Sequence, residues 1–273
     1  MRKNLPLTEQ ERSFDPSQRL ISATDAKGKI LYCNDEFEDV SGFTREELIG
    51  SPHNIVRHPD MPPPVYEHMW QCLKAEKSWM GIVKNRCKNG DHYWVEAYVT
   101  PTFDNGRLAG FESVRTKPSL ERVARATAFY ASINSGKLTP PAVLAVKSTF
   151  LELWIPTAVG LAVAAAALVA GASFTGASLP LISAVVAGFI ASRQFKGRVN
   201  AALTEVPDAF DSELAAQVFT EDRDVTAKLR MVLISEGARI RTVLTRIGDY
   251  AERSRPAKGL RIRRFLPAKP KKP

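Results

Sequence analysis

The stretch from residue 79 to residue 94 combines large aromatic side chains with hydrogen-bonding groups. Its aromatic residues are Trp79, Tyr93 and Trp94, and Asn85 is one of several polar residues between them. Flat apolar walls with a few placed donors and acceptors are what a small-molecule pocket requires. We therefore predict that this stretch forms one wall of a ligand pocket.

A second group of polar side chains lies upstream, in a segment with five prolines between residues 51 and 64. Proline fixes φ, lacks a backbone donor and restricts the residue before it, so a rigid, extended loop is predicted. Such a loop can bind a ligand, although a solvated surface loop would have a similar composition. Its polar residues are His53, Asn54, Arg57, His58 and Asp60.

The surrounding patterns predict a sheet with short helices. The turn Lys88-Asn89-Gly90-Asp91 joins two runs of strand-forming residues, because Asn-Gly supplies the positive φ angles of a tight hairpin. Asn34 is placed to cap one helix, and Thr44 with Glu47 forms a capping box for another. The fold class is therefore α+β, a five-stranded antiparallel sheet with short helices on one face. We predict strands over 20–24, 29–33, 79–88, 92–103 and 107–116, and helices over 35–40, 65–76 and 120–133.

The order of these motifs resembles that of a PAS domain over residues 20–116. The general marks are Asn34-Asp35-Glu36-Phe37, the segment from Ser41 to Gly50, and the Lys-Asn-Gly-Asp hairpin. A finer resemblance is to the flavin-binding PAS domain of bacterial aerotaxis receptors. Three separated blocks carry it: Pro52-His53-Asn54 with Val56 to Pro62, Trp79 to Arg86, and Lys88 to Val95.

The resemblance implies that the domain binds FAD and that particular residues are important for flavin retention or signalling. Arg57, His58, Asp60 and Asn85 each match a motif position of the family. Arg57 suits the pyrophosphate, because a guanidinium can bind it with two parallel hydrogen bonds. Asn85 suits the N5/O4 edge of the ring, where the hydrogen-bond pattern changes on reduction.

Three more residues complete the predicted cofactor site. Trp79 and Tyr93 suit walls for the flat faces of the flavin ring, and Asn34 is a helix cap that can also line the pocket. We interpret Trp70 as a core residue and His68 as a surface or hydrogen-bonded histidine, with haem ligation by His68 as an alternative. The sequence shows no Ser/His/Asp grouping and no phosphate-binding glycine loop, so catalysis is disfavoured.

The positive charge of the chain is concentrated in its tail. The formal net charge is +9, and the tail from Arg253 to Pro273 holds nine basic residues and no acidic one. Nucleic-acid binding by the body of the protein is therefore poorly supported, whereas the tail is either a solvated run or a ligand for an anionic membrane surface. The three cysteines, Cys33, Cys72 and Cys87, have no metal-binding spacing, so we predict buried thiols in a reducing compartment.

No charged residue occurs between Leu153 and Ser192. Such a run exceeds an ordinary buried helix, and it divides at the segment Gly171–Gly176. We predict two membrane-spanning helices, near 152–170 and 175–192, each long enough to cross a bilayer. Flanking basic residues place the PAS domain and both termini on the cytoplasmic side of a bacterial inner membrane. The alternative is a soluble helical hairpin that is buried in a partner.

The chain divides into six predicted segments. These are a polar, poorly ordered segment, 1–19; the PAS sensor domain, 20–118; a helical linker, 119–150; the membrane hairpin, 151–192; a helical relay region, 193–252; and the basic tail, 253–273. The relay region resembles the HAMP-like unit of aerotaxis receptors, and we expect the chain to lack the kinase-control hairpin that follows it in those receptors. A heptad seam in this region comprises Leu229, Leu233, Glu236, Ile240, Val243, Ile247 and Tyr250.

These features predict a membrane-anchored cytoplasmic redox or oxygen sensor that binds FAD and signals without being an enzyme. Its expected partners are a second copy of itself, the lipid bilayer and, indirectly, other chemoreceptors or a chemotaxis kinase complex. A haem-type gas sensor, a flavoenzyme and an interaction module with an empty PAS pocket are the alternatives.

Overall fold

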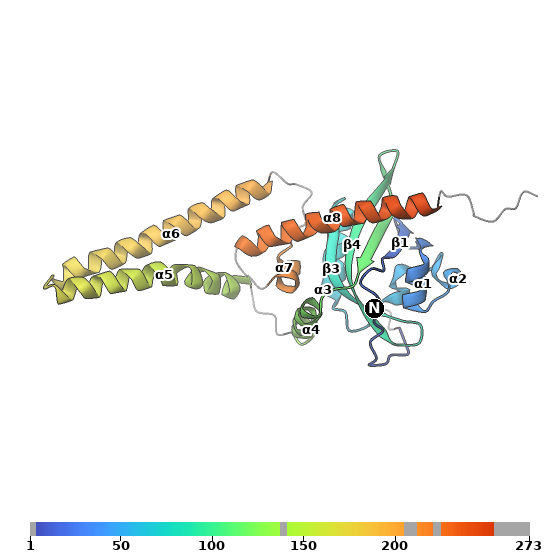
Figure 1. Ribbon diagram of the computed structural model, residues 1–273, viewed down its shortest axis with the longest axis horizontal. Coiled ribbons are helices and arrows are strands. Elements are labelled where there is room, and N and C mark those ends of the chain that lie inside the picture. The colour runs from blue at the N-terminus through green and yellow to red at the C-terminus, as the bar shows by residue number, and fades with distance from the viewer. Residues whose placement is uncertain (1–3, 137–140, 205–211, 221–224, 254–273) are drawn as a thin grey trace, which may run out of the picture.

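A five-stranded antiparallel sheet forms the centre of the N-terminal domain in the computed structural model (Figure 1). The structure describes residues 4–136, 141–204, 212–220 and 225–253. The order of strands across the sheet is β2-β1-β5-β4-β3. The predicted sheet is therefore confirmed, with strand ends that differ from the prediction by only one or two residues. The strands are β1 Leu20–Asp25, β2 Ile30–Cys33, β3 Trp79–Arg86, β4 His92–Asp104 and β5 Arg107–Thr116.

Alternation along the strands gives the sheet two different faces. Ala97 pairs with Arg115 and Val99 pairs with Ser113, so these four residues share one face, which we call the inner face. Glu96 and its neighbours of the same parity point to the opposite, outer face. The elements that cover the inner face are α1 Asp35–Ser41, α2 Arg45–Leu48, the 3-10 helix η1 His53–Val56 and α3 Pro63–Lys74.

Local sequence determines where the short helices begin and end. Asn34 caps α1 as predicted, and Gly42 ends that helix with a φ of 71°. Thr44 and Glu47 form the predicted capping box of α2. The helix α3 begins at Pro63, two residues before its predicted start, because a proline at the first helical position has no N–H that an intrahelical bond would need.

Helices also cover the outer face, contrary to the expectation of helices on one face only. The helices α4 Leu120–Asn134, α7 Glu213–Phe219 and α8 Val225–Arg253 contact β3 or β4. Figure 1 shows α8 running across the sheet. Tyr130 of α4 is buried, and its hydroxyl donates to the carbonyl of Ile82 at 2.6 Å. These helices come from beyond residue 119, so their packing depends on long-range contacts that strand alternation does not encode.

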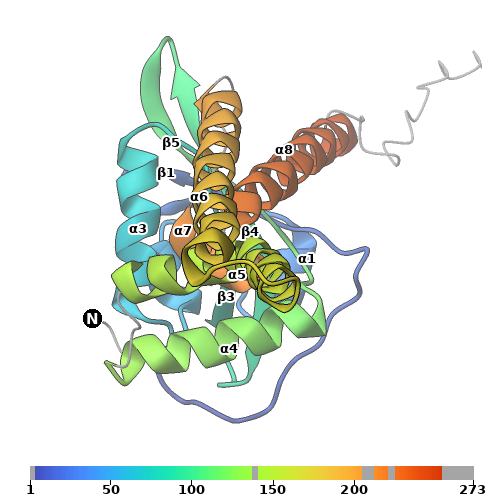
Figure 2. The ribbon, with the colours of Figure 1, turned by 90° about the vertical axis from the view of Figure 1, so that its left-hand side faces the viewer.

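The N-terminal segment is packed against the domain, where we predicted a poorly ordered segment. Asn4 is only 5% exposed, and its amide donates to the backbone carbonyls of Asn54 and Arg57 at 2.8 and 2.9 Å. Phe14, farther along, belongs to the buried core. The segment, the dark blue trace in Figure 2, runs around the outside of the domain between these anchors. A few specific contacts therefore order a segment whose composition is mostly polar.

Two long helices, α5 Pro141–Val169 and α6 Phe174–Thr204, pair as a hairpin that extends away from the sheet (Figures 1 and 2). The two predicted membrane spans fall on these helices. Among the described residues, Ser178–Leu203 is the one helix that is long and apolar enough to cross a membrane, and Trp154–Val169 is a shorter apolar helix. Large apolar side chains are exposed on both helices, as at Val169.

Some predictions for the C-terminal region lie outside the described residues. These are the basic tail after Arg253 and the side chain of Tyr250 in the heptad seam. The other seam residues lie on α8, which is continuous from Val225 to Arg253.

Candidate functional site

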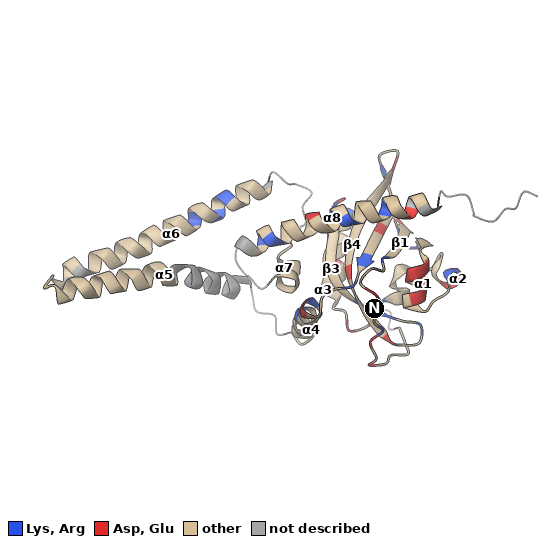
Figure 3. Cartoon of the chain, in the orientation of Figure 1, with Lys and Arg blue, Asp and Glu red and all other residues tan. Residues whose placement is uncertain are grey.

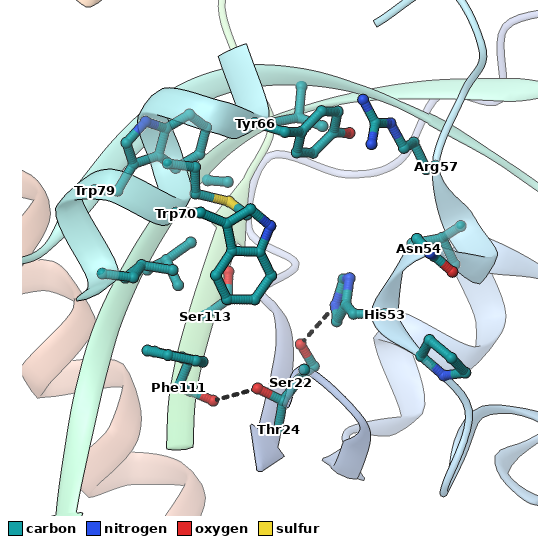
Figure 4. Close-up of a pocket in the computed structure, with 18 of the residues that line it drawn as sticks. Ser22, Thr24, His53, Asn54, Arg57, Tyr66, Trp70, Trp79, Phe111 and Ser113 are labelled. Atoms are coloured by element: carbon teal, nitrogen blue, oxygen red, sulfur yellow. Dashed lines mark hydrogen bonds between the residues drawn. The ribbon is translucent and has the colours of Figure 1, made fainter. Parts of the chain in front are cut away.

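A cavity of about 220 Å³ lies between the inner face of the sheet, α3 and the proline-rich loop. Figure 4 shows the indoles of Trp70 and Trp79 on one side of it and His53, Asn54 and Arg57 on the other. Aromatic and aliphatic side chains make up most of the lining. Among its described lining residues there is no Asp or Glu, whereas the basic ones are Lys27, Arg57 and Arg115. The cavity is therefore suited to a flat ligand that carries negative charge.

Aromatic rings fix the apolar part of the cavity. Trp79, the first residue of β3, is 3% exposed, and its Nε1 donates to Nδ1 of His68 on α3 at 3.2 Å. The indole lies close against Gly81, because a Cβ at Gly81 would come within 2.3 Å of its Cη2. Trp70 packs edge-on against Phe111, with ring centroids 5.6 Å apart. Gly81 therefore leaves the space that Trp79 occupies beside the strand.

The proline-rich loop brings Arg57 and Asn54 to the cavity. The N–H of Arg57 donates to the carbonyl of Asn54 at 3.1 Å, which closes η1. The guanidinium lies 3.6 Å from the ring centroid of Tyr66. Its Nε and Nη2 are buried and have no hydrogen-bond partner among the described residues. Burial lowers the pKa of Arg57. Two unused donors in a fixed fork are suited to the oxygens of a phosphate or carboxylate.

A second guanidinium, that of Arg115 on β5, contacts two neutral partners in the cavity. It donates through Nη1 and Nη2 to Oγ of Ser22 at 3.1 and 3.0 Å, and through Nη2 to Nε2 of His53 at 2.7 Å. His53 also contacts Ser22, which Figure 4 marks by a dashed line. The sheet and the loop are therefore joined by hydrogen bonds at this side of the cavity.

The family model of the PAS fold matches residues 30–115, which contain β2 to β5 and all the short helices of the inner face. Residues 30–115 form a PAS domain. This match agrees with the sequence resemblance and with the observed antiparallel sheet.

The PAS domain is similar to parts of larger signalling proteins. Over 131 residues the chain is 44% identical to the aerotaxis receptor of Escherichia coli, an alignment that covers 48% of this chain and 26% of the receptor. Over 84 residues it is 30% identical to the nitrogen fixation regulatory protein of Klebsiella pneumoniae, covering 31% of this chain and 17% of that protein. Among solved structures, the PAS domain of a protein from Colwellia psychrerythraea is 23% identical with a TM-score of 0.35, covering 37% of this chain and 86% of that one. The chain thus spans about a quarter of the length of the receptor it matches.

The cavity of the PAS domain is lined by three of the seven residues that we predict to bind the cofactor, namely Arg57, Trp79 and Asn85. Asn85 lies on β3 and is 4% exposed. Its backbone forms an isolated antiparallel bridge with that of Arg57, so the strand and the loop meet at these two residues.

His58 and Asp60 lie outside the cavity lining and secure the loop. The N–H of Asp60 donates to Nδ1 of His58 at 3.2 Å, and its carboxylate pairs with Lys84 of β3 at 2.8 Å. The carbonyl of Asp60 accepts a hydrogen bond from Asn134 of α4 at 2.8 Å. Burial lowers the pKa of His58 to about 4, so the ring is neutral and can accept. These contacts hold the loop that carries Arg57 against β3 and α4.

Tyr93 and Asn34 also lie outside the cavity lining. Tyr93 shares the inner face with Ala97 but lies four residues away on β4, where it is fully buried in the core. Burial raises its pKa. Asn34 uses its side chain to join segments of the domain: it accepts from the N–H of Ile21 at 2.9 Å and donates to the carbonyl of Arg19 at 2.7 Å. Neither residue is part of the cavity lining: Asn34 is hydrogen-bonded within the fold, and Tyr93 is buried in the core beside it.

The cavity also contains residues that our sequence reasoning did not assign to the site. Trp70, which we interpreted as core, lines the cavity, and so does Tyr66. Three further additions with a readable signal come from β5, where alternation places every second residue on the inner face. The alternating pattern of β5 could have identified Arg115 from the sequence, because an arginine on the buried face of a strand is unusual unless it faces a cavity or a partner. These β5 residues are Phe111, Ser113 and Arg115.

We expect acid to destabilise the PAS domain. Burial lowers the pKa of all four histidines of the chain, to about 3 for His53 and about 4 for His58. In the unfolded chain the histidines take up protons near their ordinary pKa of 6.5, whereas in the folded chain His53 and His58 take them up only near pH 3 and 4. The free energy of unfolding is therefore highest above pH 6.5 and decreases as the pH falls toward 4. The loss is up to about 1.4 kcal/mol per pH unit for each such histidine. Thermal unfolding of the purified chain across this range measures it, and His58→Gln should flatten the dependence. An equal slope in the variant and the wild type would contradict the assignment.

Proposed function

We propose that the chain is a membrane-anchored sensor that binds FAD in its PAS domain and relays the redox state of the flavin in aerotaxis-type signalling. The observation that carries this proposal is the cavity, where aromatic walls meet the buried Nε and Nη2 of Arg57, which have no hydrogen-bond partner among the described residues. The 44% identity with the E. coli aerotaxis receptor supports the same role. The proposed role is signalling and not catalysis.

The residues of the cavity fit a flavin. Trp79 and Trp70 offer apolar faces for the ring, and Asn85 can both donate to and accept from its polar edge. The fork of Arg57 suits the phosphates. A volume of about 220 Å³ is below the roughly 300–1,000 Å³ of sites that enclose a whole ligand, so we expect the ring system and not the entire dinucleotide to be enclosed. The bound flavin supplies electron transfer, and the residues of the chain bind and orient it.

The outer face of the sheet provides the proposed route to the relay helix. Glu96 is 7% exposed and pairs with Arg122 of α4 and, at 3.8 Å, with Arg241 of α8. Glu112 pairs with Arg246 of α8 at 2.6 Å. Figure 3 shows acidic and basic segments meeting where α8 crosses the sheet. Because residues of the inner and outer faces alternate along the same strands, we propose that a shift of β4 or β5 at the cavity is passed to α8.

The hairpin of α5 and α6 is the proposed membrane anchor. Its distal part has no charged residue, which Figure 3 shows as tan helices, and its large apolar side chains are exposed. We propose that both helices span the bacterial inner membrane and that the PAS domain and both termini are cytoplasmic.

A second copy of the chain is the proposed partner of α8. The seam residues Leu233, Ile240 and Ile247 are 66%, 59% and 61% exposed. A heptad spacing of exposed apolar residues is self-complementary, which suits a homodimer. The opposite side of α8 packs within the chain, where its buried residues include Met231, Ala238 and Thr242.

One experiment tests the cofactor and the anchor together. Membranes of cells that produce the chain should contain about one flavin per chain, with the absorbance of oxidised flavin after purification in detergent. Arg57→Met should lower the flavin content at least tenfold, because a hydrogen bond to a charged group contributes about 1.5–3 kcal/mol. The control is Arg107→Met on the exposed β4–β5 hairpin, which should retain flavin.

Three outcomes would contradict the proposal. A Soret band would favour the haem-type sensor, and a colourless purified chain without extractable flavin would favour the empty interaction module. Recovery of the chain in the soluble fraction would contradict the membrane anchor.

A further inference from the structure

We propose that Arg115 is a fixed positive charge that raises the reduction potential of the bound flavin, and that His53 is the positioning residue that holds Arg115 in place. This inference rests on the proposed function and deepens it, because it assigns the residue that tunes the sensor.

The first step is that the charge of Arg115 has no counter-charge in the cavity. Arg115 is 5% exposed and lines the cavity, yet the described lining contains no Asp or Glu. Buried charges are normally paired because their desolvation is costly. The hydrogen-bond partners of Arg115 are Ser22 and His53, and the ring of Phe37 lies 5.1 Å from its guanidinium carbon. All three are neutral groups, so they orient the charge without cancelling it.

The second step concerns the protonation of His53. Nε2 of His53 receives an N–H of Arg115 at 2.7 Å, so that nitrogen cannot itself carry a proton. Burial and the nearby Arg115 lower the pKa of His53 to about 3, so its ring is neutral at physiological pH. Burial lowers the pKa of Arg115 only to about 10, so the guanidinium remains charged there. His53 therefore acts as a fixed acceptor, and the charge of Arg115 does not vary with pH across the physiological range.

The third step is electrostatic. In the bound flavin, reduction by dithionite would add two electrons and one proton to the ring and leave it with a net negative charge, while dithionite would be oxidised to sulfite. A positive charge in a buried site with low polarity favours the more negative of two ligand states. The lining supplies two further cations, Lys27 and Arg57, but Lys27 is exposed and is screened by solvent. Arg115 is the most deeply buried of the three, so its removal should change the redox equilibrium most.

The test is a dithionite titration of the full chain in detergent, with the midpoint potential read from flavin absorbance. Arg115→Met should shift the equilibrium toward the oxidised form at least tenfold, about 30 mV for a two-electron couple. Arg115→Lys should shift it less, because the charge is kept. His53→Leu should lower the potential in the same direction, whereas His53→Gln should not, because its amide oxygen still accepts from Arg115. The matched control, Arg107→Met on the exposed hairpin, should leave the potential unchanged.

The outcomes separate this inference from the proposed function. A wild-type chain without flavin would contradict the proposed function itself. A wild-type chain with flavin, whose potential is unchanged in Arg115→Met, would overturn the role of Arg115. If Arg115→Met does not fold, the midpoint potentials of Arg115→Lys and His53→Leu test the inference instead. Potentials equal to that of the wild type in both variants would overturn it.

Discussion

Replacing Gly81 by alanine is expected to lower the flavin content of the purified chain at least tenfold. The added Cβ would lie 2.3 Å from Cη2 and 2.4 Å from Cζ2 of Trp79, far inside van der Waals contact. Trp79 is 3% exposed and has open space only on its cavity side, so the indole must shift into the volume that the ring of the flavin needs. Overpacking of this kind costs about 1–3 kcal/mol, and a tenfold loss of binding corresponds to about 1.4 kcal/mol.

The effect is measured as flavin per chain after purification, together with the thermal stability of the chain. Gly248→Ala on α8 is the matched control, because a Cβ there would meet nothing within 4 Å. The double variant Gly81→Ala/Trp79→Phe should regain part of the flavin, since the smaller ring needs less room. Equal flavin content in Gly81→Ala and in the wild type would contradict the role of Gly81.

Arg122→Met is expected to destabilise the folded chain by about 3 kcal/mol, because it removes one partner of a buried ion pair. The partner that remains is Glu96, which is 7% exposed and would keep only the longer, 3.8 Å contact with Arg241. Burying a carboxylate with so little compensation is costly. We also expect faster amide hydrogen exchange in α4 and α8, because Glu96 is the residue that contacts both helices.

Two variants make this second result specific. The double variant Arg122→Met/Glu96→Leu should recover most of the lost stability, because it removes the buried charge along with its partner. Arg45→Met breaks a surface pair with Asp35 and Glu38, in which the side chain of Arg45 is 46% exposed, and should cost only about 0–1 kcal/mol. Equal losses in Arg122→Met and Arg45→Met would show that the Glu96 pair contributes no more than a surface contact.

The sheet and the short helices were predictable because local signals determine them. The Asn89-Gly90 turn, the Asn34 cap and the Thr44 capping box each act over a few residues, and each is present in the structure, although in the turn Gly90 and not Asn89 has a positive φ. The covering of the outer face was not predictable in this way. Glu96 alternates with apolar residues of β4, so it has the pattern of a solvent-facing residue. It is buried because arginines from α4 and α8, distant in sequence, pair with it.

In the candidate site, too, local motifs made some residues predictable, whereas long-range contacts determine the others. Arg57, Trp79 and Asn85 line the cavity because a loop and a strand with clear motifs carry them. His58 and Tyr93 belong to the same motifs but pack elsewhere, since a motif fixes the order of residues and not the direction of each side chain. Arg115 was missed because no motif marks it; its role depends on contacts with residues 22 and 53, which lie far away in the sequence.

The hydrogen bond between Asn134 and the carbonyl of Asp60 has a consequence for the direction of information flow. Asn134 is the last residue of α4, on the path to the helical hairpin that we propose as the membrane anchor, and Asp60 belongs to the loop that carries Arg57. Thermodynamic linkage is reciprocal. If a ligand in the cavity changes the stability of this hydrogen bond, then a mechanical change at the hydrogen bond changes the affinity of the cavity for that ligand by the same free energy. If the hairpin is the membrane anchor that we propose, bilayer tension or thickness that tilts it would change the retention of the proposed cofactor, and the anchor would be an input to the sensor as well as its support.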